Sequence, residues 1–387
     1  MVNSKGHLLL NNKYSIKKIT NLNDFEKLKP RWDNLAEKQG VYMPFLCFDW
    51  FKVWLEHFLN GNKLLILLLY KGNEIVTIAP CLIKEGRFKG IGVRKIELLG
   101  NVYSPIRYFL CGSLGDEERE EYFYLVFRFL REFSRNWDTF DLTAIPEEGD
   151  CFDSVKRAVG KAGLKYLEYF CYGDWYLDGI NYSGEEYFKR YFTSKLRHNI
   201  RYRERKLEER GKIEFKIIED EESIDKYMAH YYGVYSKSWQ KQEGIGPTFH
   251  LDLAKMAAKH GWLRLGFLFL DGVPIAAHFW VTCNAYGFIL KSVYDQNYKE
   301  YGPGKILTLR MIKHGIDVDR IGGIDYVQGD EPYKEEWTPK RRERKGILIY
   351  NNSIRGKALE VLERKILPVV NKNKHLRKFK ESISKRL

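Results

Sequence analysis

The stretch of residues 286–337 constrains the fold more than any other part of the chain. It opens with residues 288–294, a short apolar run rich in strand-forming side chains, and a polar turn follows. A Gly-Pro-Gly-Lys motif stands at 302–305, and the apolar residues after it recur at the spacing of one helical face. Proline suits the first helical position, because its φ is already helical and its missing amide needs no partner there. The stretch therefore predicts a strand, a loop and a helix.

The start of this predicted helix has the features of an anion site. The amides of Gly304, Lys305 and Ile306 are expected to point outward at the positive end of the helix dipole. Glycine lets a ligand approach the backbone closely, and each charge-assisted bond to a pyrophosphate contributes roughly 1.5 to 3 kcal/mol. The motif is also ordinary turn chemistry, so two interpretations stay open. The candidate cofactor-binding residues are Gly302, Gly304, Lys305, Ile306, Val293 and Tyr294.

A second predicted strand at residues 324–327 closes a strand, helix, strand unit. Residues 329–337 follow it directly and form a dense polar and aromatic patch. Ligands of open α/β sheets bind outside the carboxyl ends of the strands. The candidate catalytic residues in and beside this patch are Asp330, Lys334, Tyr333, Asp325 and Tyr326.

These motifs, in this order, resemble the acetyltransferase family named after the cellulose-biosynthesis protein CelD, a FemAB-like branch of the GNAT superfamily. The resemblance extends to a basic helix opening at residues 194–199, to Ser238-Trp239, to a hairpin turn at 271–274 and, upstream, to Leu99-Gly100-Asn101. It covers about residues 14–340 and is strongest from residue 194 onward. It implies the α/β (α+β) class, with two GNAT-like domains in tandem, each a mixed, largely antiparallel sheet flanked by helices.

The expected domains are residues 14–180, a degenerate GNAT-like domain on the acceptor side, and residues 181–340, which hold the donor site. A basic helical tail is expected at 341–387. The length of 387 residues suffices for two cores. The first domain has no Gly-rich loop, whereas the second carries the motifs described above.

The resemblance implies an N-acyltransferase that moves an acyl group, acetyl above all, from acyl-CoA to an amino sugar or to a cell-envelope or exopolysaccharide precursor. No metal is expected. Since no Gly-x-Ser-x-Gly elbow and no Cys and His pair stand out, we expect direct transfer, in which near-attack geometry supplies on the order of 7 to 11 kcal/mol. Asp330 or Asp325 is expected to take the acceptor proton, Tyr326 or Tyr333 to steady the leaving thiolate, and Lys334 to bind an anionic group or the oxyanion.

The candidate substrate-binding residues come from three other places. They are Asn101, Tyr103, Ser104, Arg197, Arg201, Trp239 and Trp337. Each has a structural alternative: the loop at 100–105 is also a plain strand-ending turn, and the basic run at 188–210 is also a solvated helix face. His278 lies within an apolar strand, where a core histidine is the better interpretation.

Two other functions fit the same sequence. FemAB-type relatives take aminoacyl-tRNA as donor, so an aminoacyl-tRNA-dependent transferase of cell-wall synthesis is an alternative, and tRNA is a partner under that alternative only. A non-catalytic binding module that keeps the fold is the other.

The net charge of +14 is uneven, because 16 Lys and Arg stand against 4 Glu from Lys340 onward. The basicity is therefore no argument for nucleic acid by itself. The six cysteines are scattered and no apolar run has the length of a membrane span, so a cytoplasmic location is expected. The tail repeats Leu376, Phe379 and Ile383 among basic residues, a pattern typical of peripheral contact with the inner face of a membrane. A solvated tail, or a helix packed on its own domain, is the alternative.

Overall fold

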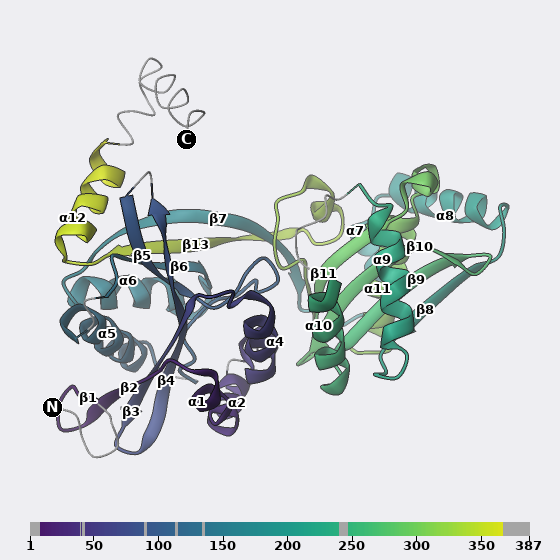
Figure 1. Ribbon diagram of the computed structural model, residues 1–387. Coiled ribbons are helices and arrows are strands. Elements are labelled where there is room, and N and C mark those ends of the chain that lie inside the picture. The colour runs from purple at the N-terminus through teal and green to yellow at the C-terminus, as the bar shows by residue number, and fades with distance from the viewer. Residues whose placement is uncertain are drawn as a thin grey trace.

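The computed structural model describes residues 8–38, 40, 43–88, 91–112, 115–133, 136–239 and 247–366. These residues form two lobes joined by one continuous mixed sheet (Figure 1). The sheet has 13 strands in the order β1-β2-β3-β4-β5-β6-β13-β7-β12-β11-β10-β9-β8. Among the described residues, no helix has the length and apolar character needed to cross a membrane.

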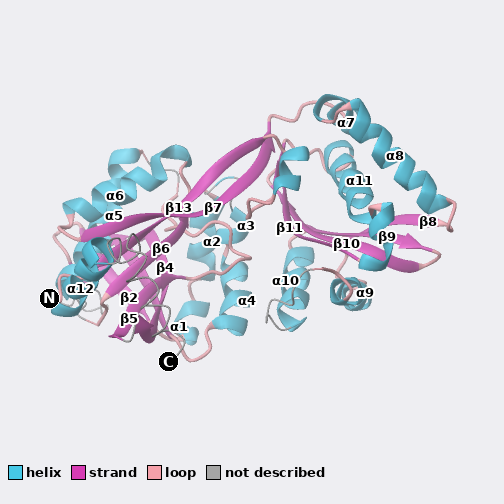
Figure 2. Ribbon diagram, turned by 90° about the horizontal axis from the view of Figure 1, so that it is seen from above, coloured by secondary structure: helices cyan, strands magenta, loops and turns pink. Residues whose placement is uncertain are grey.

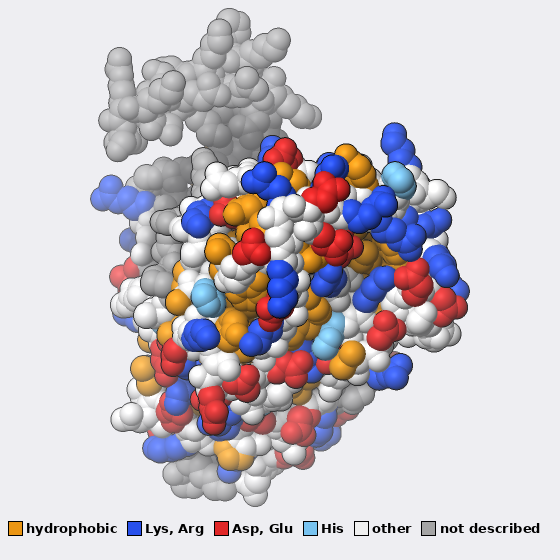
Figure 3. Space-filling view, turned by 90° about the vertical axis from the view of Figure 1, so that its right-hand side faces the viewer, with side chains coloured by type: hydrophobic (Ala, Val, Ile, Leu, Met, Phe, Trp, Pro, Cys, Tyr) orange, Lys and Arg blue, Asp and Glu red, His pale blue; other side chains and the backbone are white. Residues whose placement is uncertain are grey.

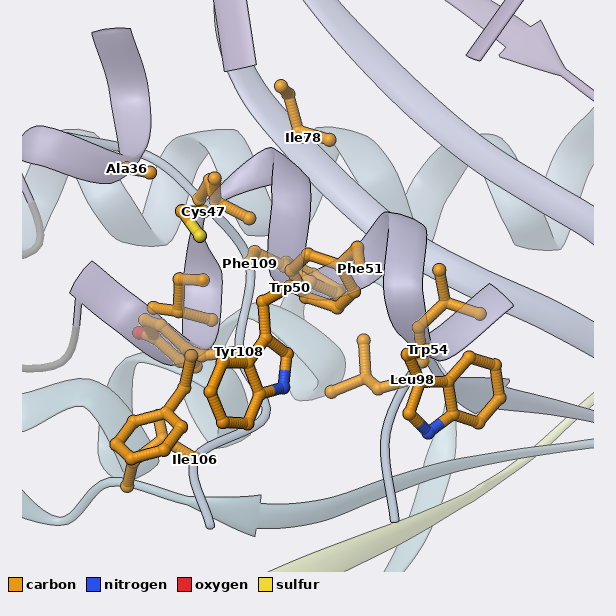
Figure 4. Close-up of a cluster of buried hydrophobic side chains, with 14 of the residues drawn as sticks. Ala36, Cys47, Trp50, Phe51, Trp54, Ile78, Leu98, Ile106, Tyr108 and Phe109 are labelled. Carbon is orange, nitrogen blue, oxygen red and sulfur yellow. The ribbon is translucent and has the colours of Figure 1, made fainter. Parts of the chain in front are cut away.

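The first lobe packs helices on the strands that begin the chain. Its elements are β1 (Leu8–Leu9), β2 (Tyr14–Ile19), α1 (Leu22–Glu26), α2 (Lys29–Glu37), α3 (Met43–Leu46), α4 (Phe48–Phe58), β3 (Lys63–Lys71), β4 (Glu74–Phe88), β5 (Ile91–Leu98), α5 (Asp116–Phe133), β6 (Thr139–Ile145), α6 (Cys151–Lys161) and β7 (Lys165–Asp178). Trp50, Phe51 and Trp54 of α4 point into its core, as Figure 4 shows. These aromatic side chains are buried and form part of the hydrophobic core of the first lobe.

The second lobe contains the predicted strand, helix, strand unit. Its elements are α7 (Gly184–Tyr191), α8 (Ser194–Glu208), β8 (Ile213–Ile218), α9 (Ile224–Ser236), α10 (Pro247–Lys259), β9 (Leu263–Leu270), β10 (Val273–Cys283), β11 (Tyr286–Tyr294), the 3-10 helix η3 (Gln296–Tyr301), α11 (Pro303–Asp317), β12 (Gly323–Asp325) and the 3-10 helix η4 (Pro332–Glu336). Helices α7, α8 and α11 lie on one face of the sheet and α9 and α10 on the other (Figure 2). The expected α/β class is confirmed.

The basic run at residues 188–210 is divided between two helices instead of forming one. Phe192, which is buried in the core, has an extended backbone and ends α7. Thr193 then caps α8, since its side chain accepts a hydrogen bond from the Leu196 amide at 3.2 Å. The break gives α8 a direction of its own across the outer face of the lobe.

The chain returns to the first lobe through β13 (Lys340–Tyr350), followed by α12 (Ile354–Val361) and the π-helical turn η5 (Leu362–Ile366). The prediction of a helical tail from residue 341 is wrong for residues 341–350, which pair with β7 along the whole strand and with β6 over its second half. The strand was not predicted because its first residues are charged, although Ile347 and Ile349 at its apolar end are fully buried. The predicted amphipathic segment of the tail lies outside the described residues.

Strand β7 links the two lobes, because its last residues pair with β12 and the rest of it pairs with β13. The predicted boundary between residues 180 and 181 falls just after β7, and the division into domains stays a prediction. A continuous sheet fixes the position of one lobe against the other.

A buried network of charges lies beside this link. Asp174 of β7 accepts hydrogen bonds from Arg342 at 2.7 Å and from Arg344 at 2.9 Å, and the Arg344 guanidinium also bonds Glu148 of the first lobe at 2.7 Å. Arg342 reaches on to Asp325 at the end of β12. The carboxyls of Asp174 and Asp325 and the Arg344 side chain are 1 to 2% exposed. Buried charges need partners, and here each side chain finds them on other strands.

We predict that Arg344→Met lowers the stability of the protein strongly, because it leaves Asp174 buried with one cationic partner fewer. Breaking a buried ion pair costs about 3 to 5 kcal/mol, which urea unfolding measures. Arg341→Met is the matched control on the same strand, since the Arg341 side chain is 32% exposed and its partner Asp330 43%. An exposed pair contributes about 0 to 1 kcal/mol. Equal shifts in the two variants would contradict the structural role of the network.

Candidate active site

Strands β11 and β12 run parallel but pair over a short length, the last pair being Phe288 and Asp325. Beyond it the two strands part. Residues 289–292 and 326–329 line a cavity of ≈ 240 Å³ in the opening, which we call the central cavity. Parted strands turn backbone groups toward a cavity instead of toward each other, so a ligand there meets main-chain donors and acceptors.

The central cavity lies between the two lobes. Val102 and Tyr103 of the first lobe line it on one side. Tyr103 is buried, and its hydroxyl lies 2.7 Å from Nε2 of His250 on α10, a contact that holds the loop against the second lobe. Of the three candidates in this loop, Tyr103 therefore lies at the cavity.

Glu331, Tyr333 and Lys334 are the residues of the predicted polar patch that line the same cavity. The Lys334 ammonium is buried, donates to the Gln328 carbonyl and pairs with Glu331 at 2.8 Å. Glu331 is half exposed. The sequence patch thus contributes one carboxylate and one ammonium, held together in the opening of the sheet.

Asp330 lies outside the lining of the cavity. Its carboxylate forms a two-bond ion pair with Arg341, at 2.7 and 2.6 Å, and this hydrogen bonding lowers the pKa of Asp330. An ideal Cβ on Gly173 would lie 2.2 Å from the same carboxylate, so Asp330 packs flat on the β7 backbone. These contacts give Asp330 a structural place beside the site.

Asp325 also lies outside the lining, enclosed by Arg342 and by the Val327 amide. Burial, together with the negative charge of Asp174, raises the pKa of Asp325. Tyr326 is buried and lines the cavity. The structure therefore brings Tyr326, but not Asp325, to the candidate site.

A second cavity of ≈ 830 Å³ lies at the start of α11, and we call it the α11 cavity. Its lining contains most of the predicted donor residues and the two predicted tryptophans. The lining residues are Arg203, Trp239, Ser292, Tyr294, Gln296, Asn297, Lys299, Glu300, Gly302, Gly304, Lys305, Thr308, Tyr333 and Trp337. Val293 and Ile306 are fully buried beneath it.

The helix start differs from the expected cradle of three free amides. The amides of Lys305 and Ile306 both donate to the Gly302 carbonyl, at 3.0 and 3.2 Å, so the expectation is wrong for these two. Gly302 adopts a left-handed backbone with φ of 60°, which turns its carbonyl toward them. The Gly304 amide is then the main-chain donor on which an anion site here depends.

Basic side chains at the α11 cavity can bind an anion in place of the Lys305 and Ile306 amides, which are occupied by the Gly302 carbonyl. The Arg203 guanidinium packs on Gly302, where an ideal Cβ would lie 2.8 Å from its Nη1. Lys299 and Lys305 line the same cavity, and Lys305 also pairs with Glu336 at 2.6 Å. Trp239 is 59% exposed at the rim. Exposed aromatic and basic side chains around one cavity fit a ligand that has both a ring system and phosphates.

The remaining candidates have structural partners, and only Trp337 among them lines a cavity. Asn101 bonds the amide of Tyr103 through its side chain, and Ser104 accepts from the Trp50 indole. Arg197 donates to the Lys189 carbonyl at 2.9 Å, and Arg201 contacts Glu185 at 3.4 Å. Trp337 lines the α11 cavity but packs edge-on against Phe192 in the core.

Two side chains connect the cavities, since Ser292 and Tyr333 line both. Burial raises the pKa of Tyr333, so its phenol stays protonated at neutral pH. Sequence reasoning found Tyr333 but missed Ser292, Arg203 and Glu331. Alternation along β11 could not have found Ser292, because the register of β11 against β10 shifts at Leu290 and changes the face on which the later residues lie.

Glu219, His314 and Asp319 could together hold a metal ion by their spacing. They lie outside the linings of both cavities. The Arg264 guanidinium bonds Asp319 at 2.9 and 2.8 Å and already supplies the positive charge there. This group is therefore a structural ion pair at the edge of the second lobe.

Comparison with known proteins agrees with this geometry. Residues 194–335 match the family model of the acetyltransferase (GNAT) domain. The structure of FemX is similar over 89% of this chain and 99% of its own, with 11% identity and a TM-score of 0.57. The C-terminal domain of a putative lysylphosphatidylglycerol synthetase from Agrobacterium fabrum is similar over 87% and 97%, with 12% identity and a TM-score of 0.51. No curated protein sequence matches the chain.

The second lobe therefore has the fold of a GNAT domain over the matched residues 194–335. The chain as a whole has a FemAB-like GNAT fold, and a tandem GNAT protein from the clavulanic acid biosynthesis pathway is similar over 87% of this chain and 99% of its own, at 11% identity and a TM-score of 0.50. The expected resemblance to FemAB-like GNAT proteins is confirmed.

We predict that Gly304→Val weakens the binding of coenzyme A about tenfold or more, a loss of about 1.4 kcal/mol. An ideal Cβ at this position lies 3.0 Å from Cδ1 of Tyr294, so the valine methyls enter the α11 cavity beside the one available amide. Calorimetry measures the affinity, and the melting temperature should change little. Gly160→Val on α6, where a Cβ meets open space, is the control. Unchanged affinity in Gly304→Val would remove the donor assignment.

Proposed function

We propose that the protein is an acyltransferase that moves an acyl group directly from a donor in the α11 cavity to an amine in the central cavity. The observation that carries the proposal is that the two cavities share Ser292 and Tyr333. A donor and an acceptor bound on the two sides meet at these side chains. Because geometry alone supplies a large part of the rate enhancement, such a site needs no covalent intermediate.

Glu331 is the carboxylate placed to take the acceptor proton, and we assign to it the role expected of Asp330. The acceptor nitrogen forms a bond to the acyl carbon, its proton passes to Glu331, and the bond from that carbon to the leaving sulfur breaks. A thiol has a pKa of about 8.5, so the thiolate leaves without an obligatory acid from the protein. Lys334, at 2.8 Å from Glu331, keeps the carboxylate in the cavity.

Acyl-CoA is the proposed donor, and an amino sugar or an envelope precursor the proposed acceptor. The aromatic and basic lining of the α11 cavity, with Trp239, Arg203 and Lys299, supports a donor that carries an adenine ring and phosphates. The lining of the central cavity by Val102 of the first lobe and Glu331 of the second supports an acceptor site between the lobes.

Aminoacyl-tRNA is the alternative donor, and the surface of α8 favours it. Lys195, Arg201, Arg205 and Lys206 are exposed on this helix, and Arg203 connects it to the α11 cavity. In Figure 3 many Lys and Arg side chains gather on the upper part of the second lobe, the level of α8 in Figure 1. Basic side chains beside a cavity are what a nucleic-acid backbone requires.

One experiment separates these donors. Purified full-length protein is incubated with radiolabelled acetyl-CoA, or with tRNA charged with a radiolabelled amino acid, and with a pool of amino sugars and cell-wall precursors. Label transferred from acetyl-CoA supports the proposal. Transfer from tRNA alone selects the alternative, and transfer from neither would leave the fold as a binding module.

We predict that Glu331→Gln lowers kcat by about 10²- to 10⁴-fold, the usual contribution of a general base, with donor affinity unchanged. Asp330→Asn is the matched control, because the neighbouring carboxylate faces Arg341 outside the cavity. It should turn over close to the wild-type rate. If Asp330→Asn falls and Glu331→Gln does not, the proton goes to Asp330 as the sequence patch alone indicates.

A further inference from the structure

Helix α12 packs on the sheet of the first lobe, and this contact fixes which of its sides points inward. Ser353 caps the helix, because its side chain accepts a hydrogen bond from the Gly356 amide at 3.0 Å. An ideal Cβ on Gly356 would lie 2.1 Å from the Asn351 carbonyl oxygen, so the helix lies close to the preceding backbone here. Leu359, only 2% exposed, packs in one apolar cluster with Tyr350 of β13. The side of α12 that carries Gly356 and Leu359 is therefore the inner side.

The outer side of α12 is apolar along its middle. Ile354, Ala358 and Val361 are all exposed, Ile354 at 90% and Val361 at 43%. Their spacing places them on one face of the helix. A single exposed aliphatic side chain is ordinary, whereas these three follow one another along the helix, and we call them the α12 stripe. The stripe leaves apolar surface in contact with water, which a partner of the right chemistry would cover.

Basic side chains border the α12 stripe, and the carboxylates of the same segment have other partners. At 100° per residue, Arg355 lies on one side of the stripe and Lys357 on the other, and both are exposed. In the part of the chain that the structure describes, neither forms an ion pair. Glu360 pairs with Arg364 at 3.3 Å, and Glu363 accepts a hydrogen bond from a tyrosine of β13 on the inner side. The outer side of α12 is therefore apolar and positively charged.

Helix α12 also has a distinctive place in the molecule. It lies at the end of the first lobe that is remote from the second lobe, as both ribbon views show (Figures 1 and 2). The chain continues after η5 with residues 367–387, in which seven Lys and Arg stand against one Glu. The positive charge beside the α12 stripe is thus followed in the sequence by a strongly basic segment.

We propose that α12 docks on the surface of a lipid bilayer that contains anionic lipids. The α12 stripe enters the boundary between headgroups and acyl chains, while Arg355 and Lys357 remain among the headgroup phosphates. Each cation near an anionic leaflet adds to the attraction, and the basic residues after η5 add to it in the same way. Nucleic acid would satisfy the cations but would leave the stripe in water. The inference goes beyond the proposed function, since it needs neither cavity of the candidate site.

Co-sedimentation of the full-length protein with vesicles tests the docking. Vesicles of phosphatidylcholine are compared with vesicles in which phosphatidylglycerol replaces part of that lipid. We expect the protein to sediment with the anionic vesicles, and added salt to lower the bound fraction because ions screen the attraction. Equal sedimentation with both kinds of vesicle, or with neither, would overturn the proposal.

A double variant locates the binding face on α12. Ile354→Ser with Val361→Ser should lower the ratio of bound to free protein about tenfold or more. The melting temperature should change little, because both side chains are already exposed. Val273→Ser with Val318→Ser is the matched control in the second lobe, where these valines are 48% and 63% exposed. If the α12 variant binds like the wild type, residues 367–387 suffice for attachment and docking through α12 is wrong.

The charges and the other possible occupants of this face are tested with a single substitution. Lys357→Glu should lower binding to the anionic vesicles about fivefold or more, whereas Lys18→Glu, at an exposed lysine of β2, should bind nearly like the wild type. Two results would assign the face to another partner and overturn the proposal. One is a dimer in analytical ultracentrifugation that the double serine variant on α12 converts to a monomer. The other is loss of tRNA binding in Lys357→Glu with vesicle binding retained.

Discussion

The architecture depends on buried charges that have to be paired. Asp174 and Arg344 lie in an almost dry interior between the lobes, where each would cost several kcal/mol without partners, and Asp325, whose pKa is raised, lies beside them. Their partners come from different strands, so the ion pairs form only when β7, β12 and β13 are in register. The same register fixes where β12 ends and therefore where the opening between β11 and β12 begins. The polar cluster thus fixes the end of β12, from which the central cavity opens.

Local sequence was sufficient for the elements that hold the donor. Proline at the first helical position and glycine before it specify the start of α11, and the structure has the helix at that residue. The apolar run of β11 and the turn after it were equally clear. These features are set by backbone chemistry within a few residues, and such chemistry can be read from the sequence directly.

Contacts between strands that are far apart in the sequence could not be predicted from local sequence features. The 11-residue strand β13 begins with basic residues whose partners Asp174 and Glu148 lie far away in the sequence, so its start resembles a solvated tail. Asp330 and Glu331 are adjacent and chemically alike. The position of Arg341 determines which of the two lines the cavity: Asp330 pairs with Arg341 outside it, and Glu331 lies inside it. Sequence reasoning named the patch correctly but could not assign the orientation of its side chains.

The insertion of β13 between β6 and β7 has a consequence for biosynthesis. Both neighbouring strands leave the ribosome well before β13, and the whole second lobe is made in between. Until then the first lobe contains a slot bordered by two unpaired strand edges, which are templates for any extended segment. Before β13 is synthesised, the nascent chain can therefore exchange a strand with a neighbouring chain on the same message. Once β13 leaves the ribosome, it fills the slot between β6 and β7.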